Sequence, residues 1–250
     1  MSNLEMFLQK ISNKTIKVGV IGLGYVGLPL AVTFARNDIE ILGFEKSKEK
    51  ANNVNLAHNY ICDVNDNDLN KVVLETKKLS ATVDFTRIKE CDAIIICVPS
   101  PLDKFKKPDM RFIKQSCIDI GRNMKKNIFI SLESTTYPTT TEDFMKPIIE
   151  QESGMKEGND FWLCFSPERV DPGNKNYKTD NTPKVIGALG EEAKQIALAL
   201  YSLAIQHLHI VSSPRVAEMV KILENTYRLI NISLINELAL LSGKMNIDIW

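Results

Sequence analysis

The sequence Gly-Leu-Gly-Tyr-Val-Gly at residues 22–27 constrains the fold of this chain more than any other feature. It follows an apolar run at 16–21 and precedes a helix-like stretch that begins near Leu28. Three glycines at this spacing allow a tight turn, close approach of the backbone to a pyrophosphate, and close packing of helix on strand. The pattern predicts a dinucleotide-binding turn; a glycine-rich turn without a ligand is the alternative.

Two parts of the sequence would contact the dinucleotide. The candidate residues in the turn are its three glycines and the two residues between the second and the third glycine: Gly22, Gly24, Tyr25, Val26 and Gly27. A second apolar strand, at 39–44, ends at Glu45. A carboxylate there accepts hydrogen bonds from the ribose hydroxyls and repels a 2′-phosphate, which favours NAD over NADP.

Strand-like apolar segments alternate with helical segments along most of the chain. The expected strands lie at 17–21, 40–44, 93–98, 128–132, 161–165, 184–187 and 207–211, and the expected helices at 28–36, 47–53, 68–77, 112–123, 140–151 and 191–203. Repeated strand–helix–strand units predict an α/β fold with a Rossmann-type, doubly wound, mostly parallel sheet and helices on both faces. Ligands bind at the carboxyl ends of the strands in such a sheet.

The two ends of the chain are predicted to be helical. An amphipathic pattern within residues 1–15 indicates a short lead helix. After Pro214 the pattern indicates one helix of about 28 residues, about 42 Å long, with apolar residues on more than one face. Such a helix should pack on a second domain or subunit; two shorter helices broken at 231–233 are the alternative. The expected domains are therefore 1–15, 16–212 and 213–250.

Composition narrows the class of protein. Lys and Arg together number 31, as do Asp and Glu, so the net charge of zero argues against nucleic acid or an anionic membrane surface as a partner. No apolar run approaches the roughly 20 residues that span a bilayer, and the charged N-terminal segment does not fit a signal peptide. The five cysteines show neither CxxC pairs nor zinc spacing. We expect reduced thiols, no metal site and a cytoplasmic location.

Polar residues follow several expected strands, where ligands would bind. Pro99 and Ser100 follow the strand at 93–98, Thr135 lies in a run of three hydroxyls after 128–132, and Glu168 follows 161–165. Helix capping by the hydroxyls, and a salt bridge from Glu168 to its neighbour, are the alternatives.

Two further candidates lie on the long helix. Lys221 and Asn225 are four residues apart and therefore share one face. An ammonium and a carboxamide side by side can bind an oxyanion or a water. A solvated pair is the alternative, although the residues around Lys221 are apolar.

Taken in order, these motifs resemble the UDP-glucose/GDP-mannose dehydrogenase family over nearly the whole chain after Thr15. Residues 166–174 are most similar to the branch that acts on UDP-N-acetylhexosamines, because the UDP-glucose branch places a second glutamate near Pro172. The resemblance favours UDP-N-acetylglucosamine as substrate, with UDP-N-acetylmannosamine as the alternative. A second alternative function is that of a module that binds NAD or dimerises without catalysing turnover. A β-hydroxyacid dehydrogenase is disfavoured because Ala217 stands where that class has glycine.

The resemblance implies two successive NAD-dependent oxidations of the sugar's primary alcohol to a uronic acid. Lys221 would stabilise the oxyanion and Asn225 would orient the same oxygen. Thr135 and Glu168 would hold a water, with Glu168 as base. Ser100 and Thr135 would lie near the nicotinamide. The long helix would be the family's central helix and the core of a homodimer.

The chain also departs from the family pattern. Thr139 stands where the family often has glycine, Ser100 replaces a threonine, and Glu45 replaces an aspartate. The family's nucleophilic cysteine lies in a Gly-Gly-x-Cys motif after the central helix, followed by the rest of a UDP-sugar domain, and the sequence ends at Trp250 without either. We therefore expect a truncated polypeptide that binds NAD but does not complete the reaction.

Overall fold

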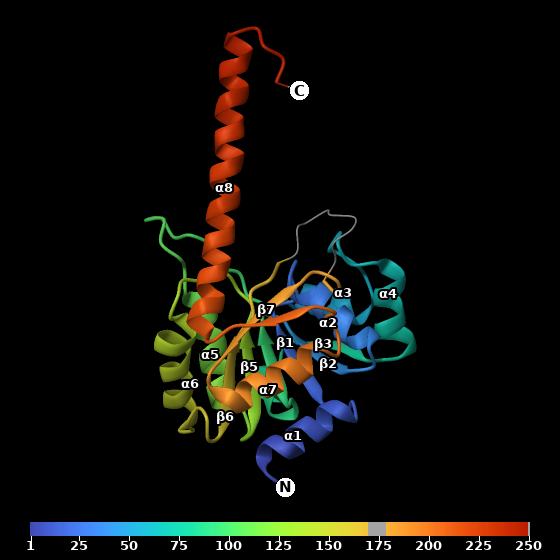
Figure 1. The fold of residues 1–250 in the computed structure, drawn as a ribbon. Coiled ribbons are helices and arrows are strands. Elements are labelled where there is room, and N and C mark those ends of the chain that lie inside the picture. Colours follow the sequence, from blue (N-terminus) through green and yellow to red (C-terminus); the bar gives the residue numbers. More distant parts are fainter. Residues whose placement is uncertain (170–178, 250) are drawn as a thin grey trace.

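The computed structural model describes residues 1–169 and 179–249, and a single sheet of eight strands forms its centre (Figure 1). The strands are β1 (Lys17–Ile21), β2 (Glu40–Phe44), β3 (Leu79–Thr82), β4 (Ala93–Ile96), β5 (Ile128–Leu132), β6 (Phe161–Phe165), β7 (Lys184–Ala188) and β8 (Leu208–Ile210). Their order is β3-β2-β1-β4-β5-β6-β7-β8. The chain crosses from one half of the sheet to the other between β1 and β4, which confirms the doubly wound fold and places the ligand crevice there.

Helices cover both faces of the sheet. They are α1 (Asn3–Ser12), α2 (Gly27–Arg36), α3 (Lys48–Asn55), α4 (Asp66–Asn70), α5 (Arg111–Asn123), α6 (Lys146–Ser153), α7 (Gly190–Tyr201) and α8 (Pro214–Lys244), with short turns η1 (Lys71–Glu75), η2 (Phe85–Glu90) and η3 (Thr140–Met145). Residues of α1, α2, α3 and α7 pack in one core, and residues of η2, α5 and α6 pack in another. Because both faces are covered, β4 and β5 are buried along their whole length.

All seven expected strands are present, with ends that differ by at most two residues. The sequence analysis missed β3 and η2. In β3 only Leu79 and Ala81 are buried, while Ser80 is exposed, so this short edge strand carries little apolar signal. The helices expected at 68–77 and 140–151 each contain a π-helical turn, η1 and η3, which apolar periodicity does not distinguish from α-helix.

The sheet is parallel except between β6 and β7. These two strands are antiparallel, with Cys164 opposite Ala188 and Phe165 opposite Gly187. Parallel neighbours need a crossover connection, usually a helix, and the described residues between these strands contain none. The reversal places Lys184, the first residue of β7, at the edge of the sheet where β5 and β6 end.

The predicted lead helix is confirmed as α1. Ser2 and Glu5 form a reciprocal capping box at its start. Phe7 and Ile11 are buried, and the Phe7 ring lies edge-on to Trp162 with their centroids 5.5 Å apart. This contact fixes α1 against the α/β body, at the end opposite to α8 (Figure 1).

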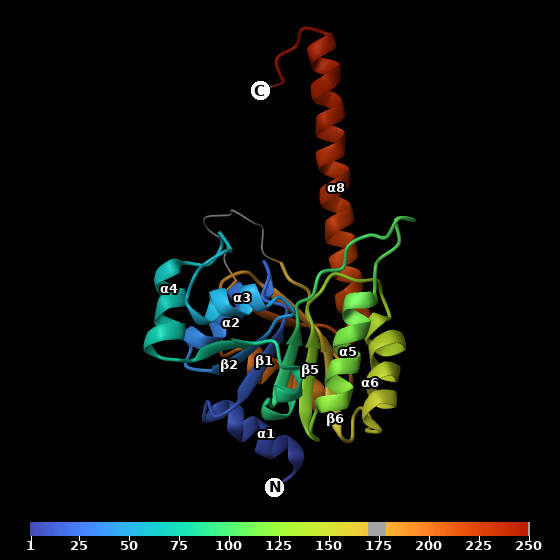
Figure 2. The same cartoon turned by 180° about the vertical axis from the view of Figure 1, so that it is seen from behind.

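The long helix is also confirmed, and the alternative of two shorter helices is wrong. α8 runs for 31 residues from Pro214, and the side chain of Ser213 caps its first turn. It begins against the sheet and projects far beyond the α/β body (Figures 1 and 2). Despite this length, neither α8 nor any other helix in the described part of the chain is apolar enough to cross a membrane.

Thr139 adopts the left-handed conformation, with φ 79° and ψ 0°. For a residue with a β-carbon this costs roughly 1–2 kcal/mol, which glycine avoids, although glycine loses more entropy on folding. We expect Thr139→Gly to raise the free energy of unfolding by about 1 kcal/mol in urea denaturation. The control is Thr33→Gly, inside α2, which should lower it by a similar amount. A less stable Thr139→Gly protein would contradict the assignment of strain.

Candidate functional site

Two glycines of the 22–27 turn are required by the fold itself. Gly22 has φ 90°, and a β-carbon there would lie 2.7 Å from the carbonyl oxygen of Cys97. A β-carbon on Gly27 would overlap the carbonyl oxygen of Gly22. The turn is therefore pressed against the end of β4 and against its own helix, as the sequence pattern predicts.

Gly24 is different, because nothing in the described part of the chain requires glycine there. A β-carbon at this position would meet no atom of residues 1–169 or 179–249 within 4 Å, so these residues leave the space above the backbone open. α2 begins three residues later, at Gly27, with no side-chain cap and no acidic residue in its first turn. Tyr25 is exposed and Val26 half-buried at this helix start. An open backbone beside an uncapped helix N-terminus fits the pyrophosphate of a dinucleotide.

Glu45 is held at the rim of the same turn. Its carboxylate accepts hydrogen bonds from the backbone N–H groups of Leu23 at 3.2 Å, Lys46 at 2.8 Å and Ser47 at 3.2 Å. Tyr60, which the sequence analysis missed, donates its hydroxyl to the Leu23 carbonyl oxygen at 2.8 Å. Burial, and secondly the Glu45 charge, raise the pKa of Tyr60 to about 12. Both side chains fix the turn where the adenosine ribose of a dinucleotide would lie.

The loops after β4 and β5 are joined to each other. The Ser134 hydroxyl donates to the Val98 carbonyl oxygen at 2.6 Å, and Thr136 and Thr140 share a hydrogen bond of 2.6 Å. Thr135, between them, is exposed. Two of the three hydroxyls therefore stabilise the loop, and Thr135 is the one that faces outward.

On the β4 side of this junction, Pro99 is exposed and Ser100 is half-buried. Their loop follows the buried end of β4 directly. Both residues therefore lie at the carboxyl edge of the sheet, beside the outward-facing Thr135.

The structure brings Lys221 and Glu168 together. The Lys221 ammonium donates to the backbone carbonyl oxygen of Glu168. Arg169 forms an ion pair with Glu224, so the loop after β6 is attached to α8 twice. Burial lowers the pKa of Lys221, and the Glu168 charge opposes that shift. Asn225 lies one turn further along α8 and is exposed.

The rest of the motif that follows Glu168, at 170–174, lies outside the described residues. The structure therefore gives no position for Pro172 or its neighbours.

One polar residue near this site, Glu218, was not identified from the sequence. It is fully buried and accepts hydrogen bonds from the backbone N–H groups of Thr139 at 2.6 Å and Thr141 at 2.9 Å. It also accepts from the Thr141 hydroxyl at 2.7 Å. Its position three residues before Lys221, on the same helix face, was the available signal. Glu218 holds the start of α8 against the hydroxyl-containing loop.

The cysteines near this site are not activated nucleophiles. Only Cys62 is exposed, and the other four are buried. Burial raises the pKa of Cys97 well above its usual value, and it raises that of Cys164 to about 12. A thiol must ionise to act as a nucleophile, so neither is suited to that role. Within residues 1–169 and 179–249, no three metal-binding side chains gather in one place.

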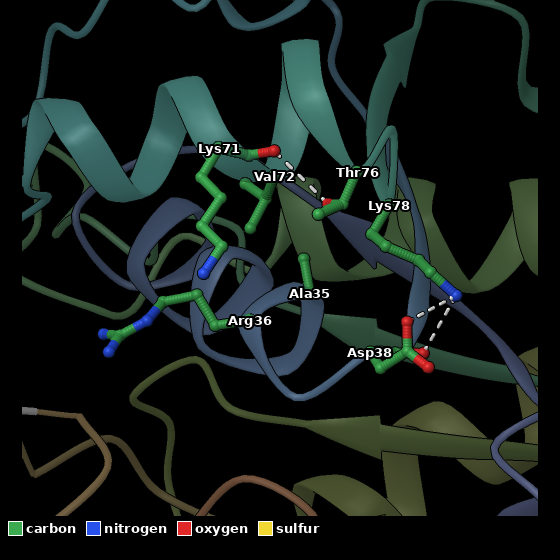
Figure 3. A pocket seen from close by; sticks show the side chains of 7 residues that line it. All are labelled: Ala35, Arg36, Asp38, Lys71, Val72, Thr76 and Lys78. Carbon is green, nitrogen blue, oxygen red and sulfur yellow. Dashed lines mark hydrogen bonds and ion pairs between the residues drawn. The ribbon is translucent and has the colours of Figure 1, made fainter.

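A small pocket lies at the opposite, amino edge of the sheet (Figure 3). It is lined by Ala35, Arg36, Asp38, Lys71, Val72, Thr76 and Lys78. Lys78 is paired with Asp38 at 2.8 Å and Arg36 with Asp68 at 3.0 Å, so two of its cations are already neutralised. This pocket is separate from the glycine-rich turn and from Lys221.

Comparison with known proteins identifies the family. Residues 16–205 match the model of the NAD-binding domain of the UDP-glucose/GDP-mannose dehydrogenase family, and residues 215–250 match its central domain. The UDP-N-acetyl-D-glucosamine 6-dehydrogenase of Pseudomonas aeruginosa is 36% identical over 236 residues, which are 94% of this chain and 55% of that protein. The chain thus spans about half the length of such relatives.

Solved structures agree with this assignment. UDP-D-ManNAc dehydrogenase from Pyrococcus horikoshii superposes with a TM-score of 0.85 at 33% identity, covering 92% of this chain and 55% of that one. GDP-mannose dehydrogenase from Pseudomonas aeruginosa superposes with a TM-score of 0.86 at 27% identity, covering 92% and 54%. The chain therefore belongs to the UDP-glucose/GDP-mannose dehydrogenase family and carries its NAD-binding domain.

Proposed function

We propose that this protein takes part in the NAD-dependent oxidation of a UDP-N-acetylhexosamine at its primary alcohol, giving a uronic acid. The preferred substrate is UDP-N-acetylglucosamine, in keeping with the relative of that name, and UDP-N-acetylmannosamine is the alternative. The contact of Lys221 with the Glu168 loop carries the proposal, because it brings an ammonium from α8 to the strand ends. The open glycine-rich turn lies at the same edge.

In this proposal each polar residue has one task. NAD, when bound, supplies the hydride acceptor. The Lys221 ammonium stabilises negative charge that develops on the sugar oxygen, and Asn225 orients that oxygen. Thr135 and Glu168 hold a water, and Glu168 acts as base when this water attacks the oxidised carbon in the final hydrolysis.

The second oxidation in this family needs a thiolate nucleophile. The buried thiols of Cys91, Cys97, Cys117 and Cys164 do not fit that task, and the exposed Cys62 does not lie in a Gly-Gly-x-Cys motif. We therefore propose that residues 1–250 alone bind NAD without completing both oxidations. Steady formation of uronic acid from UDP-N-acetylglucosamine by this polypeptide would refute that part.

The exposed surface of α8 supports a homodimer. Apolar side chains, each at least 41% exposed, recur every three or four residues along one stripe: Met219, Leu223, Tyr227, Ile230, Leu234, Leu238, Leu241 and Met245. A stripe at this spacing buries itself against another helix. We propose that a second copy of α8 covers it. Sedimentation of the wild-type chain measures its oligomeric state, and a monomer at every concentration would count against the dimer.

The cofactor assignment is tested most directly at Gly24. A β-carbon there meets no atom of the described residues within 4 Å, so Gly24→Ala should leave thermal stability unchanged. It should weaken NAD binding at least tenfold, because the methyl group occupies the space where the pyrophosphate would approach. Calorimetric titration with NAD measures the effect. In the matched variant, Gly27→Ala, stability itself should fall, since that β-carbon overlaps Gly22. Unchanged NAD affinity in Gly24→Ala would exclude the turn as the cofactor site.

A further inference from the structure

A buried ion pair lies beneath the site and has no task in the proposed reaction. Lys184 is 4% exposed, and its ammonium lies 2.7 Å from the carboxylate of Glu133, which is 1% exposed. The Tyr201 hydroxyl, from α7, donates to the other oxygen of Glu133 at 2.7 Å and lies 2.9 Å from the Ser131 hydroxyl. Burying an ion pair costs desolvation energy that its attraction often does not recover, so stability alone is a weak reason for it.

The reversal of β7 explains why Lys184 lies there. Cys164 faces Ala188 and Phe165 faces Gly187, so β7 begins at the edge of the sheet where β6 ends and the loop with Glu168 starts. The Lys184 ammonium is 3.8 Å from the Glu168 carboxylate. Since Lys221 binds the Glu168 backbone, this residue lies between two ammonium groups, one on its main chain and one near its side chain.

The charge on Lys184 is stabilised by its two carboxylate neighbours. Burial by itself would lower the pKa of Lys184, but Glu133 and Glu168 outweigh it and raise that pKa above its usual value. The other titratable groups near Glu168 in the described residues are Lys221, Arg169 and the Cys97 thiol. Of these side chains, Lys184 is the ammonium that lies within ion-pair distance of the Glu168 carboxylate.

We propose that Lys184 is a positioning residue for the reaction: clamped by Glu133 and Tyr201, its ammonium holds the Glu168 carboxylate in place. The inference rests on the proposed function, in which Glu168 acts on the water. Lys184 itself touches neither substrate nor cofactor. Its contribution is the orientation of the base.

The test removes both charges of the buried pair together. In the complete natural protein, Glu133→Gln with Lys184→Met keeps an acceptor for Tyr201 and takes the Lys184 ammonium away from Glu168. We expect KM for NAD to stay near the wild-type value and kcat to fall about tenfold or more. A purely structural pair would lower the free energy of unfolding and leave kcat of the folded variant unchanged.

Two further variants complete the design. Lys17→Met removes an ammonium that pairs with Glu90 at 3.0 Å at the far edge of the sheet, and it should leave kcat unchanged. Tyr201→Phe removes a hydrogen bond to the Glu133 carboxylate while keeping every charge. This variant therefore tests the positioning role of Lys184 if the double variant does not fold. Its kcat should fall several-fold at unchanged KM for NAD.

The outcomes separate the two proposals. Wild-type protein that oxidises neither UDP-N-acetylhexosamine overturns the proposed function, and this inference with it. An active wild type whose folded double variant keeps its kcat overturns the inference alone, as does wild-type kcat in Tyr201→Phe.

Discussion

Replacing Lys221 with methionine should lower kcat by about 10²–10³-fold in the complete natural protein, while NAD affinity stays close to wild type. Methionine keeps most of the side chain's length but removes the positive charge. The ammonium contacts the Glu168 loop and is partly removed from water, which strengthens its effect on a developing negative charge. Steady-state kinetics with UDP-N-acetylglucosamine and calorimetry with NAD measure the two quantities separately.

The pH dependence provides a second check on Lys221. Burial lowers the pKa of Lys221 below its usual value of 10.5. Activity that needs the ammonium is fully present below this lowered pKa and is lost as the pH rises through it. The wild-type rate should therefore fall at a lower pH than an ordinary lysine would give, and this basic limb should be absent from Lys221→Met. The control is Lys244→Met, in the last turn of α8, where kcat should not change. Equal kcat in Lys221→Met would remove Lys221 from its role.

Glu218→Ala should lower the free energy of unfolding by about 3 kcal/mol. The carboxylate is fully buried and accepts three hydrogen bonds, two of them from backbone N–H groups of Thr139 and Thr141. Alanine leaves these donors buried without an acceptor, which costs more than the lost bonds alone. Urea denaturation followed by circular dichroism gives the change.

The expected loss extends to the position of α8. Glu218 joins the first turns of α8 to the loop after β5, and Lys221 follows one turn later. We therefore expect Glu218→Ala to lower kcat as well, even at temperatures where the variant is folded. Glu237→Ala, on the exposed part of the same helix, is the matched control and should be close to neutral. A Glu218→Ala protein as stable as that control would show that this contact does not hold the helix.

Much of the candidate site could be read from the sequence because its signals are local. The glycines at 22–27 are required by the backbone conformation and packing of a few neighbouring residues. Glu45 is identified by its position at the end of the next strand. Lys221 was identifiable because a charge among apolar helix neighbours is unusual. In contrast, Tyr60 and Glu218 bind residues far away in the chain, and although Glu218 shares a helix face with Lys221, no local pattern identifies those distant partners.

The sequence by itself determined the alternation of strands and helices, the glycine-rich turn and the unbroken helix from Pro214, because each depends on residues close in the chain. Only the tertiary structure decided that β7 runs against β6 and that Lys184 consequently lies between Glu133 and Glu168. Strand direction depends on the path of the connection and on pairing between distant segments, neither of which apolar periodicity encodes. The same holds for the contact of Lys221 with the Glu168 loop, which exists only because α8 packs where the strands end.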